Sequence, residues 1–477
     1  MKKILPALIA HIAVILAIVI SFGVISVTAD RSASGNEKFT GVLERNVTLH
    51  VLENNTAKEQ GYLKELLDSF NERYKEYGIK AVDANIDQYN DLEQSGPFGY
   101  GPDVLYQAND AVMKYVDGHH ILPLPLEKIA CKDLVSENAW SAYEKNIDQQ
   151  SYTFGVPVNI QQPLLFYRKD LLPADWETEW DDNKNGIPDM IENWSALYRF
   201  SKQIRQESGG KKYGYMQSLC DSYFSSGYLF SFGGYVFGGE DGTDTRDIGF
   251  DKGESYKGAK IVRQLASVMN MECTEFTVSD NRYSRLAEGT YFATMTTPDV
   301  YTMFIREMVN KGYTEEYAKE NVVMVDVPQV PVSGDLEDES LGFKDMTVMG
   351  GVNGYAISSY TSYPNAALEF VNYATSYKMV KKRYELLGIS PARKDVVDEI
   401  GGLHKEINDN LDGNSIYVMP SVRATAQIWP PMENFFSLIA GDMLENKNVY
   451  STDEALKNGL KKVSKDAYDA IHTLSGS

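Results

Sequence analysis

The residues from Asp181 to Glu192 have the composition and spacing of a calcium-binding EF-hand loop. Such a loop presents oxygen ligands at alternate positions, turns sharply at a glycine and closes with a bidentate glutamate. Gly186 falls at the turn, and the expected ligands are Asp181, Asn183, Asn185, the backbone carbonyl of Ile187, Asp189 and Glu192. The alternative is an Asp- and Asn-rich turn before a helix with an acidic start. Because the side-chain positions agree with the template, we expect a Ca²⁺ ion in a structural role.

Short motifs of catalysis are missing from the sequence. It contains no GxSxG, no HExxH and no phosphate-binding P-loop. Carboxylates are plentiful, with 67 Asp and Glu residues, so their presence alone does not indicate a glycosidase. A glycosidase needs two carboxyl groups at a fixed separation across a cleft, one of them with a raised pKa. We therefore expect a protein that binds rather than an enzyme.

Composition excludes several classes of protein. The 46 Lys and Arg residues leave a net charge of −21, which argues against nucleic-acid binding because phosphates need cations. The cysteines Cys131, Cys220 and Cys273 are far apart and form no CxxC pair, so a disulfide framework and a zinc site are not expected. A length of 477 residues predicts two domains.

The N-terminus predicts export from the cytoplasm. Lys2 and Lys3 precede an apolar run over 4–27, and the small residues at 27–29 resemble a cleavage site. The run is also long enough to span a bilayer uncleaved. We therefore expect a signal peptide or membrane anchor over 1–29, a polar tether over 30–42 and a secreted or cell-envelope location.

Strand and helix patterns alternate from residue 43 onward. Val47–Leu52 alternates as a strand, apolar residues then recur at helical spacing up to Tyr74, and a second strand begins after Gly78. A strand, a helix and a strand of this length form a βαβ unit, so the fold class is α/β.

Five segments in a fixed order carry a family pattern. They are 101–110, 156–161 with 166–173, 233–237, 288–296, and 419–420 with Trp429. Together they resemble the maltose/maltodextrin-binding family of extracellular solute-binding proteins. The resemblance implies a two-lobed, periplasmic-binding-protein-like fold with discontinuous domains joined by hinge strands. We expect residues 43–158 plus 354–402 in the first lobe and 159–353 plus 403–477 in the second.

The resemblance also implies ligand residues between the lobes. Trp429 is the expected stacking platform, Asp110 a hydroxyl-binding carboxylate, and Asp221 with Tyr223 the second-lobe contacts. The alternatives are a core Trp, a helix N-cap at Asp110 and core packing of Tyr223. Loops that follow sheet strands face such clefts, which adds two further candidates, Glu53 and Asn55.

Several positions that contact the sugar in the family hold different residues in this sequence. Gln107 occupies the position of a stacking Trp in the family, and Gln161 occupies the position of a hinge Glu. Asp299 occupies the position of another Trp, for which the nearby Tyr301 is a possible substitute. Ala111 and Glu433 each replace an Arg of the family pattern. Since two of the three aromatic residues that stack on sugar rings in the family are absent, we expect the ligand to be an oligosaccharide other than maltose.

The predicted function is that of a monomeric solute-binding protein of an ABC importer, which closes on its ligand and delivers it to a permease. A glycan-processing enzyme and a sensor that presents bound ligand to a membrane kinase are the alternatives on the same scaffold.

Overall fold

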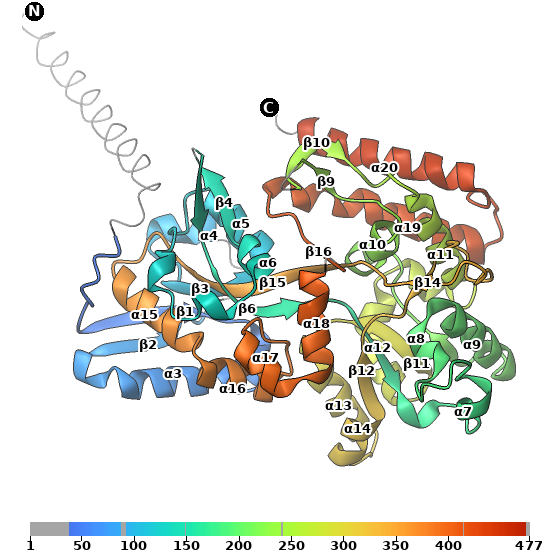
Figure 1. Cartoon of the computed structure of the whole chain (residues 1–477), viewed down its shortest axis with the longest axis horizontal. Coiled ribbons are helices and arrows are strands. Elements are labelled where there is room, and N and C mark those ends of the chain that lie inside the picture. Colours follow the sequence, from blue (N-terminus) through green and yellow to red (C-terminus); the bar gives the residue numbers. More distant parts are fainter. Residues whose placement is uncertain (1–37, 87–91, 148, 240–241, 414, 474–477) are drawn as a thin grey trace, which may run out of the picture.

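Two larger β-sheets lie at the centres of two lobes that sit side by side (Figure 1). The computed structural model describes residues 38–86, 92–147, 149–239, 242–413 and 415–473. The first lobe combines the blue and teal N-terminal segments with orange segments from late in the chain, and the second lobe holds the green, yellow and red segments. The predicted α/β fold with discontinuous lobes is confirmed.

The first-lobe sheet has the strand order β16-β15-β3-β1-β2, and β6 also pairs with β15. β1 is parallel to β2 and β3, whereas β15 runs antiparallel to β3 and β6. These strands are rich in buried Val, Leu and Ile, as expected for a sheet covered by helices. Their bounds are β1 (Val47–Leu52), β2 (Ile79–Asp83), β3 (Val104–Ala108), β6 (Val156–Gln161), β15 (Val348–Ile357) and β16 (Ile416–Val418).

Helices from two separate parts of the chain pack around this sheet. They are α2 (Asn55–Glu59), α3 (Tyr62–Arg73), α4 (Leu92–Ser95), α5 (Asn109–Asp117), α6 (Glu137–Ser141), α15 (Pro364–Ala374), α16 (Tyr377–Leu387), α17 (Lys394–Ile400) and α18 (Gly402–Asp412). A hairpin of β4 (Glu144–Ile147) and β5 (Gln150–Thr153) completes the lobe.

The second-lobe sheet has the order β12-β7-β11-β8, with β7 antiparallel to both of its neighbours. Its strands are β7 (Leu164–Arg168), β8 (Tyr213–Tyr215), β11 (Tyr291–Thr296) and β12 (Val322–Val325). The helices around it are α7 (Trp176–Glu179), α8 (Asp189–Glu192), α9 (Trp194–Glu207), α10 (Ser222–Phe230), α11 (Ser255–Ala266), α12 (Thr277–Ala287), α13 (Tyr301–Asn310), α14 (Glu315–Asn321), α19 (Trp429–Leu444) and α20 (Asp453–Thr473). Two small ladders pair β9 (Phe237–Gly238) with β10 (Asp244–Ile248) and β13 (Val330–Pro331) with β14 (Phe343–Lys344).

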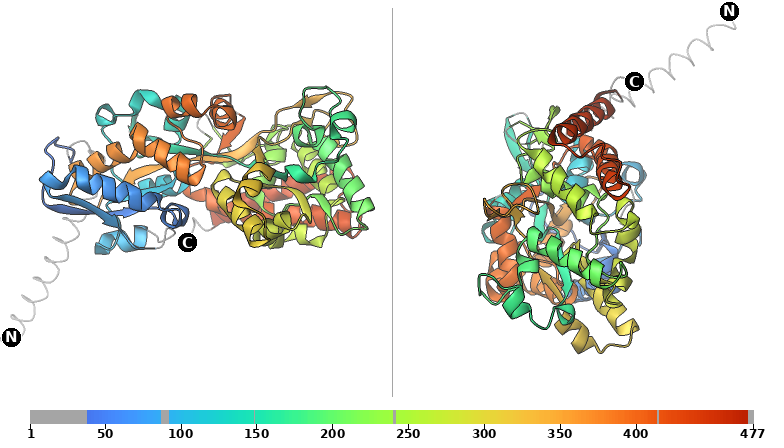
Figure 2. Two further views of the ribbon diagram at one scale, coloured as in Figure 1. Left: turned by 90° about the horizontal axis from the view of Figure 1, so that it is seen from below. Right: turned by 90° about the vertical axis from the view of Figure 1, so that its right-hand side faces the viewer.

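The chain crosses between the lobes where β6 leads into β7, where β15 begins, and where α18 leads through β16 to α19 (Figure 2). The first residues of β15 pair with β16, and its later residues pair with β6 and β3. These crossings lie near the expected lobe boundaries. One difference is α18, which was expected in the second lobe but packs against α6 and α17 of the first because its Ile407 and Leu411 are buried.

The start of the described chain is attached to the first lobe. Phe39 is buried, and its carbonyl accepts a hydrogen bond of 2.7 Å from Lys128 Nζ. The predicted leader over 1–29 and the first part of the predicted tether lie outside the described residues. No helix in the described ranges has both the length and the apolar character needed to cross a membrane.

Candidate ligand-binding cleft

A cavity of about 350 Å³ lies between the lobes, next to the hinge strands. The first lobe and hinge contribute the ends of β3 and β6, the middle of β15, and Met419. The second lobe contributes the start of α10 and the loop after β11. Its lining residues are Ala108, Gln161, Gly351, Asn353, Met419, Asp221, Tyr223, Phe224 and Thr297. Clefts at strand ends and domain interfaces are where small molecules bind, so this cavity is the candidate site.

A neighbouring pocket of about 220 Å³ brings Trp429 opposite the first lobe. Trp429 begins α19 and is partly buried, while Gln107 and Asp110 come from the end of β3 and the first turn of α5. Lys114 and Arg423 also line this pocket. The indole therefore lines a space shared by both lobes and is not sealed in a core.

A chain of side-chain amides joins the hinge to the second lobe. Asn353 Nδ2 donates to Gln161 Oε1 at 2.8 Å, and Gln161 Nε2 donates to Asp299 Oδ1 at 3.2 Å. Asp299 is therefore linked to the cavity by its hydrogen bond with Gln161, which lines it. Both ends of the Gln161 amide are fixed by these partners.

Asn109, which was not among the expected residues, is fully buried beside the site and supports it without lining either space. Its Nδ2 donates to the Met419 carbonyl at 3.1 Å and to Ser421 Oγ at 2.8 Å, and its Oδ1 accepts from the Val352 amide at 3.2 Å. It therefore connects α5 to two hinge segments. Its place between Ala108 and Asp110, inside the family segment, was the available signal.

Carboxyl groups in the cleft have raised pKa values. Burial raises the pKa of Asp221 to about 6, an effect that Arg282 opposes and Glu433 reinforces. Burial also raises the pKa of Asp110 and of Asp299. Asp221 caps α10, accepting from the Tyr223 amide at 3.3 Å.

The family pattern of the bacterial extracellular solute-binding proteins matches residues 65–411. This chain belongs to that family. The predicted family resemblance is therefore confirmed, and the extracytoplasmic location follows from it.

Curated relatives cover most of this solute-binding protein. A galactooligosaccharide-binding protein of Bacillus subtilis is 24% identical over 364 residues, which is 74% of this chain and 75% of the relative. The maltodextrin-binding protein MdxE of the same species is 23% identical over 439 residues, or 87% and 93% of the two chains. Among solved structures, the maltose-binding protein MalE of Listeria monocytogenes, in complex with maltose, has a TM-score of 0.65 at 22% identity. It covers 88% of this chain and 97% of that one, and shows a shared fold.

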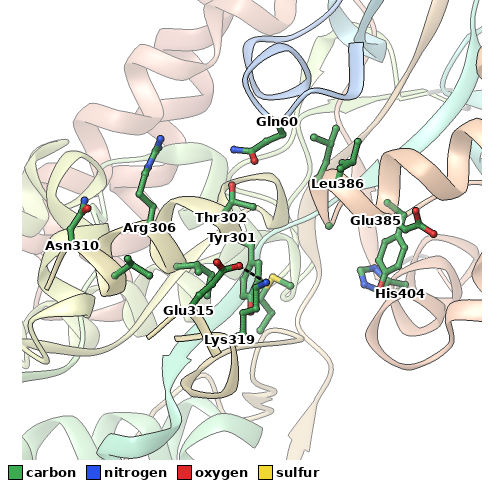
Figure 3. A pocket seen from close by; sticks show the side chains of 16 residues that line it. Gln60, Tyr301, Thr302, Arg306, Asn310, Glu315, Lys319, Glu385, Leu386 and His404 are labelled. Carbon is green, nitrogen blue, oxygen red and sulfur yellow. Dashed lines mark ion pairs between the residues drawn. The ribbon is translucent and has the colours of Figure 1, made fainter. Parts of the chain in front are cut away.

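Tyr301 of the solute-binding protein lines a different space, an open groove of about 710 Å³ (Figure 3). One side of the groove carries Gln60, Leu386 and His404 of the first lobe, and the other carries α13 and α14 of the second. Tyr301 and Asp299 were expected at the same ligand site, but Tyr301 lines this groove, whereas Asp299 is bonded to Gln161 at the central cavity. The 3-10 turn between them points side chains two residues apart in widely different directions.

The prediction that Glu53 binds ligand is wrong. Glu53 is fully buried and accepts from Arg383 Nη1 at 2.8 Å and Nη2 at 3.1 Å, with Tyr355 donating to the same carboxylate. Arg383 of α16 covers the end of β1, so the carboxylate is occupied inside the lobe. Asn55 begins α2, is exposed, and lines neither the central cavity nor the Trp429 pocket.

Several of the predicted calcium ligands in the loop before α8 hydrogen-bond within the loop or to Glu192. The Asp181 carboxylate accepts from the backbone amides of Asn185 and Gly186, both at 3.0 Å. The side-chain amides of Asn183 and Asn185 donate to Glu192 at 3.1 and 2.6 Å. Across the described ranges, no three His, Cys, Asp or Glu side chains converge closely enough to hold a metal by themselves. Asn oxygens must therefore contribute to any ion bound here.

Proposed function

We propose that this solute-binding protein binds an oligosaccharide between its lobes, as a monomer, and delivers it to the permease of an ABC importer without catalysing a reaction. The observation that carries the proposal is a pair of spaces between the lobes. In one, Asp221 of the second lobe faces Ala108 of the first, and in the other Trp429 of the second lobe faces Gln107 and Asp110 of the first. An aromatic face suits the C–H side of a sugar ring, and carboxylates accept from hydroxyl groups. The names of the two Bacillus relatives support a glycan as ligand.

Ligand binding acts by stabilising the closed arrangement of the lobes. A ligand shifts such an equilibrium only through its different affinities for the two states. A sugar held by Asp110 on the first lobe and Trp429 on the second makes both contacts only when the lobes are close.

We expect at least one oligosaccharide in a panel of maltodextrins, galacto-oligosaccharides and β-linked glycans to raise the melting temperature, because it binds only the folded state. Trp429→Ala should weaken that ligand by about tenfold or more, as loss of an aromatic anchor does. Trp176→Ala, which removes a partly buried Trp of α7 outside the cleft, is the matched control. A panel without any shift would contradict the proposal, and release of shorter glycans during incubation would favour the enzyme.

We further propose that the 181–192 loop binds Ca²⁺ and thereby stabilises the second lobe. The residues fit the ion, because rotating the amides of Asn183 and Asn185 brings their oxygens toward Glu192 in place of their nitrogens. Asp181 and Asp189 add carboxylate oxygens, and Gly186 has the positive φ of +80° that the sharp turn requires. The ion supplies charge neutralisation and a rigid connection between the loop and α8.

Removal of calcium is expected to lower the melting temperature. With free Ca²⁺ at ten times its dissociation constant, the ion adds about 1.4 kcal/mol to the free energy of unfolding. Chelator should remove this gain, and Asp181→Ala should make the protein insensitive to chelator. Asp133→Ala, at an exposed position of the first lobe, should keep the response. If chelator leaves the unmodified protein unchanged, the calcium proposal is wrong.

A further inference from the structure

Carboxylates outnumber cations around the central cavity. Asp221 lines it, Asp299 touches it through Gln161, and Asp110 lines the adjoining pocket. Burial raises the pKa of the Tyr223 hydroxyl and the charges of all three carboxylates add to the effect, so each lies within electrostatic range of Tyr223. Within the described residues, none of the three forms a salt bridge with Lys or Arg.

The cations near the cleft are engaged elsewhere or lie beyond the central cavity. Arg282 is buried and donates to the carbonyls of Ser279 and Met295, each at 3.0 Å. Arg423 lines the Trp429 pocket and forms an ion pair with Glu93. Arg282 keeps its charge and opposes the rise in pKa that burial causes at Asp221 and at Asp299, so one cation faces these two carboxylates, whereas the Trp429 pocket contains cations of its own.

The remaining unsatisfied polar group in the lining is also an acceptor. Asn353 lines the cavity, and its Oδ1 atom is buried without a hydrogen-bond partner among the described residues, although its Nδ2 is held by Gln161. Buried acceptors without donors are unfavourable, and unpaired buried carboxylates more so. A ligand that fits this cavity has to supply donors, and preferably positive charge.

We propose that the glycan taken by this protein carries a protonated amine, as in a 2-amino-2-deoxy sugar, with the ammonium group held by Asp221 beside Tyr223 in the central cavity and the nearby carboxylates of Asp299 and Asp110 adding to the attraction. The inference rests on the proposed function and adds the class of sugar. An ammonium group offers three donors and no acceptor, which matches this lining. Hydrogen bonds between ions are about twice as strong as neutral ones. The uncharged rings of the same glycan can then occupy the Trp429 pocket.

The proposal is tested with three tetrasaccharides that share one backbone. They are the β-1,4-linked glucosamine tetramer, its fully N-acetylated form and the β-1,4-linked glucose tetramer, titrated calorimetrically at neutral pH. We expect the amine form to bind at least about tenfold more tightly than either neutral form. Its affinity should fall with added salt, because the attraction is partly electrostatic. Asp299→Asn should reduce the preference for the amine, and Asp133→Asn, which removes the same charge from an exposed site, should not.

Each outcome decides a different point. Equal or tighter binding of a neutral tetramer overturns the amine proposal and leaves the oligosaccharide function standing. No binding of any of the three also overturns the amine proposal, and the broader glycan panel then decides the proposed function separately. If the preference for the amine persists when Asp299→Asn and Asp221→Asn are combined, other residues bind the positive charge and the proposed position of the ammonium group is wrong.

Discussion

Glu53→Ala is expected to lower the free energy of unfolding by about 3–5 kcal/mol, because it leaves the Arg383 guanidinium buried without its counter-ion. Neither side chain of the pair has exposed surface, and two hydrogen bonds of 2.8 and 3.1 Å join them. Arg383 also lies 3.8 Å from the ring centre of Tyr106 and 4.7 Å from that of Tyr62, so water cannot replace the lost carboxylate. Urea denaturation of the variant measures the loss.

Two further variants separate charge burial from loss of packing. Replacing both partners, as Glu53→Leu with Arg383→Met, should recover much of the stability, because no unpaired charge remains in the lobe. Glu65→Ala, at an exposed position of α3, should change stability by less than about 0.5 kcal/mol. A loss below about 1 kcal/mol for Glu53→Ala would mean that the lobe can hydrate or relax around Arg383.

The Glu53 pair illustrates what the sequence could not reveal. A carboxylate just after the first strand of an α/β lobe is as compatible with a ligand role as with a buried ion pair. The deciding residue, Arg383, is 330 positions away, and only the packing of α16 brings it to β1. The alternating strands and helices around Glu53 were predictable because their burial follows local periodicity.

The direction of side chains in short turns was a second feature that could not be predicted from the sequence. The family pattern indicated Trp429 and Asp221 through spacing alone, and both line the cleft. Asp299 and Tyr301 share one short segment, yet the 3-10 geometry points their side chains in different directions, and only Asp299 is bonded to Gln161. Asn109 was overlooked because its partners, Met419 and Ser421, come from a distant hinge segment.

Asp221→Asn is expected to stabilise the protein by about 2–3 kcal/mol at neutral pH, although Asp221 lines the cleft. Burial raises the pKa of this carboxyl from 3.8 to about 6, so the folded state holds its proton more tightly than the unfolded state does. Stability therefore falls as pH rises from about 4 to about 6, and the full cost of the buried charge remains at higher pH. Asn removes the charge and keeps an acceptor oxygen to cap α10.

The pH dependence of this gain is the decisive measurement. Below about pH 4 the carboxyl is protonated in both states, so the advantage of Asp221→Asn should disappear. The groups that face the carboxyl are the Arg282 guanidinium on α12, the Glu433 carboxyl on α19, and the Tyr223 and Phe224 backbone amides. Asp133→Asn, at an exposed site, should show no such pH-dependent gain. If Asp221→Asn instead destabilises the protein at neutral pH, attraction to Arg282 outweighs the cost of burial, and the carboxylate contributes to the fold and not only to the ligand site.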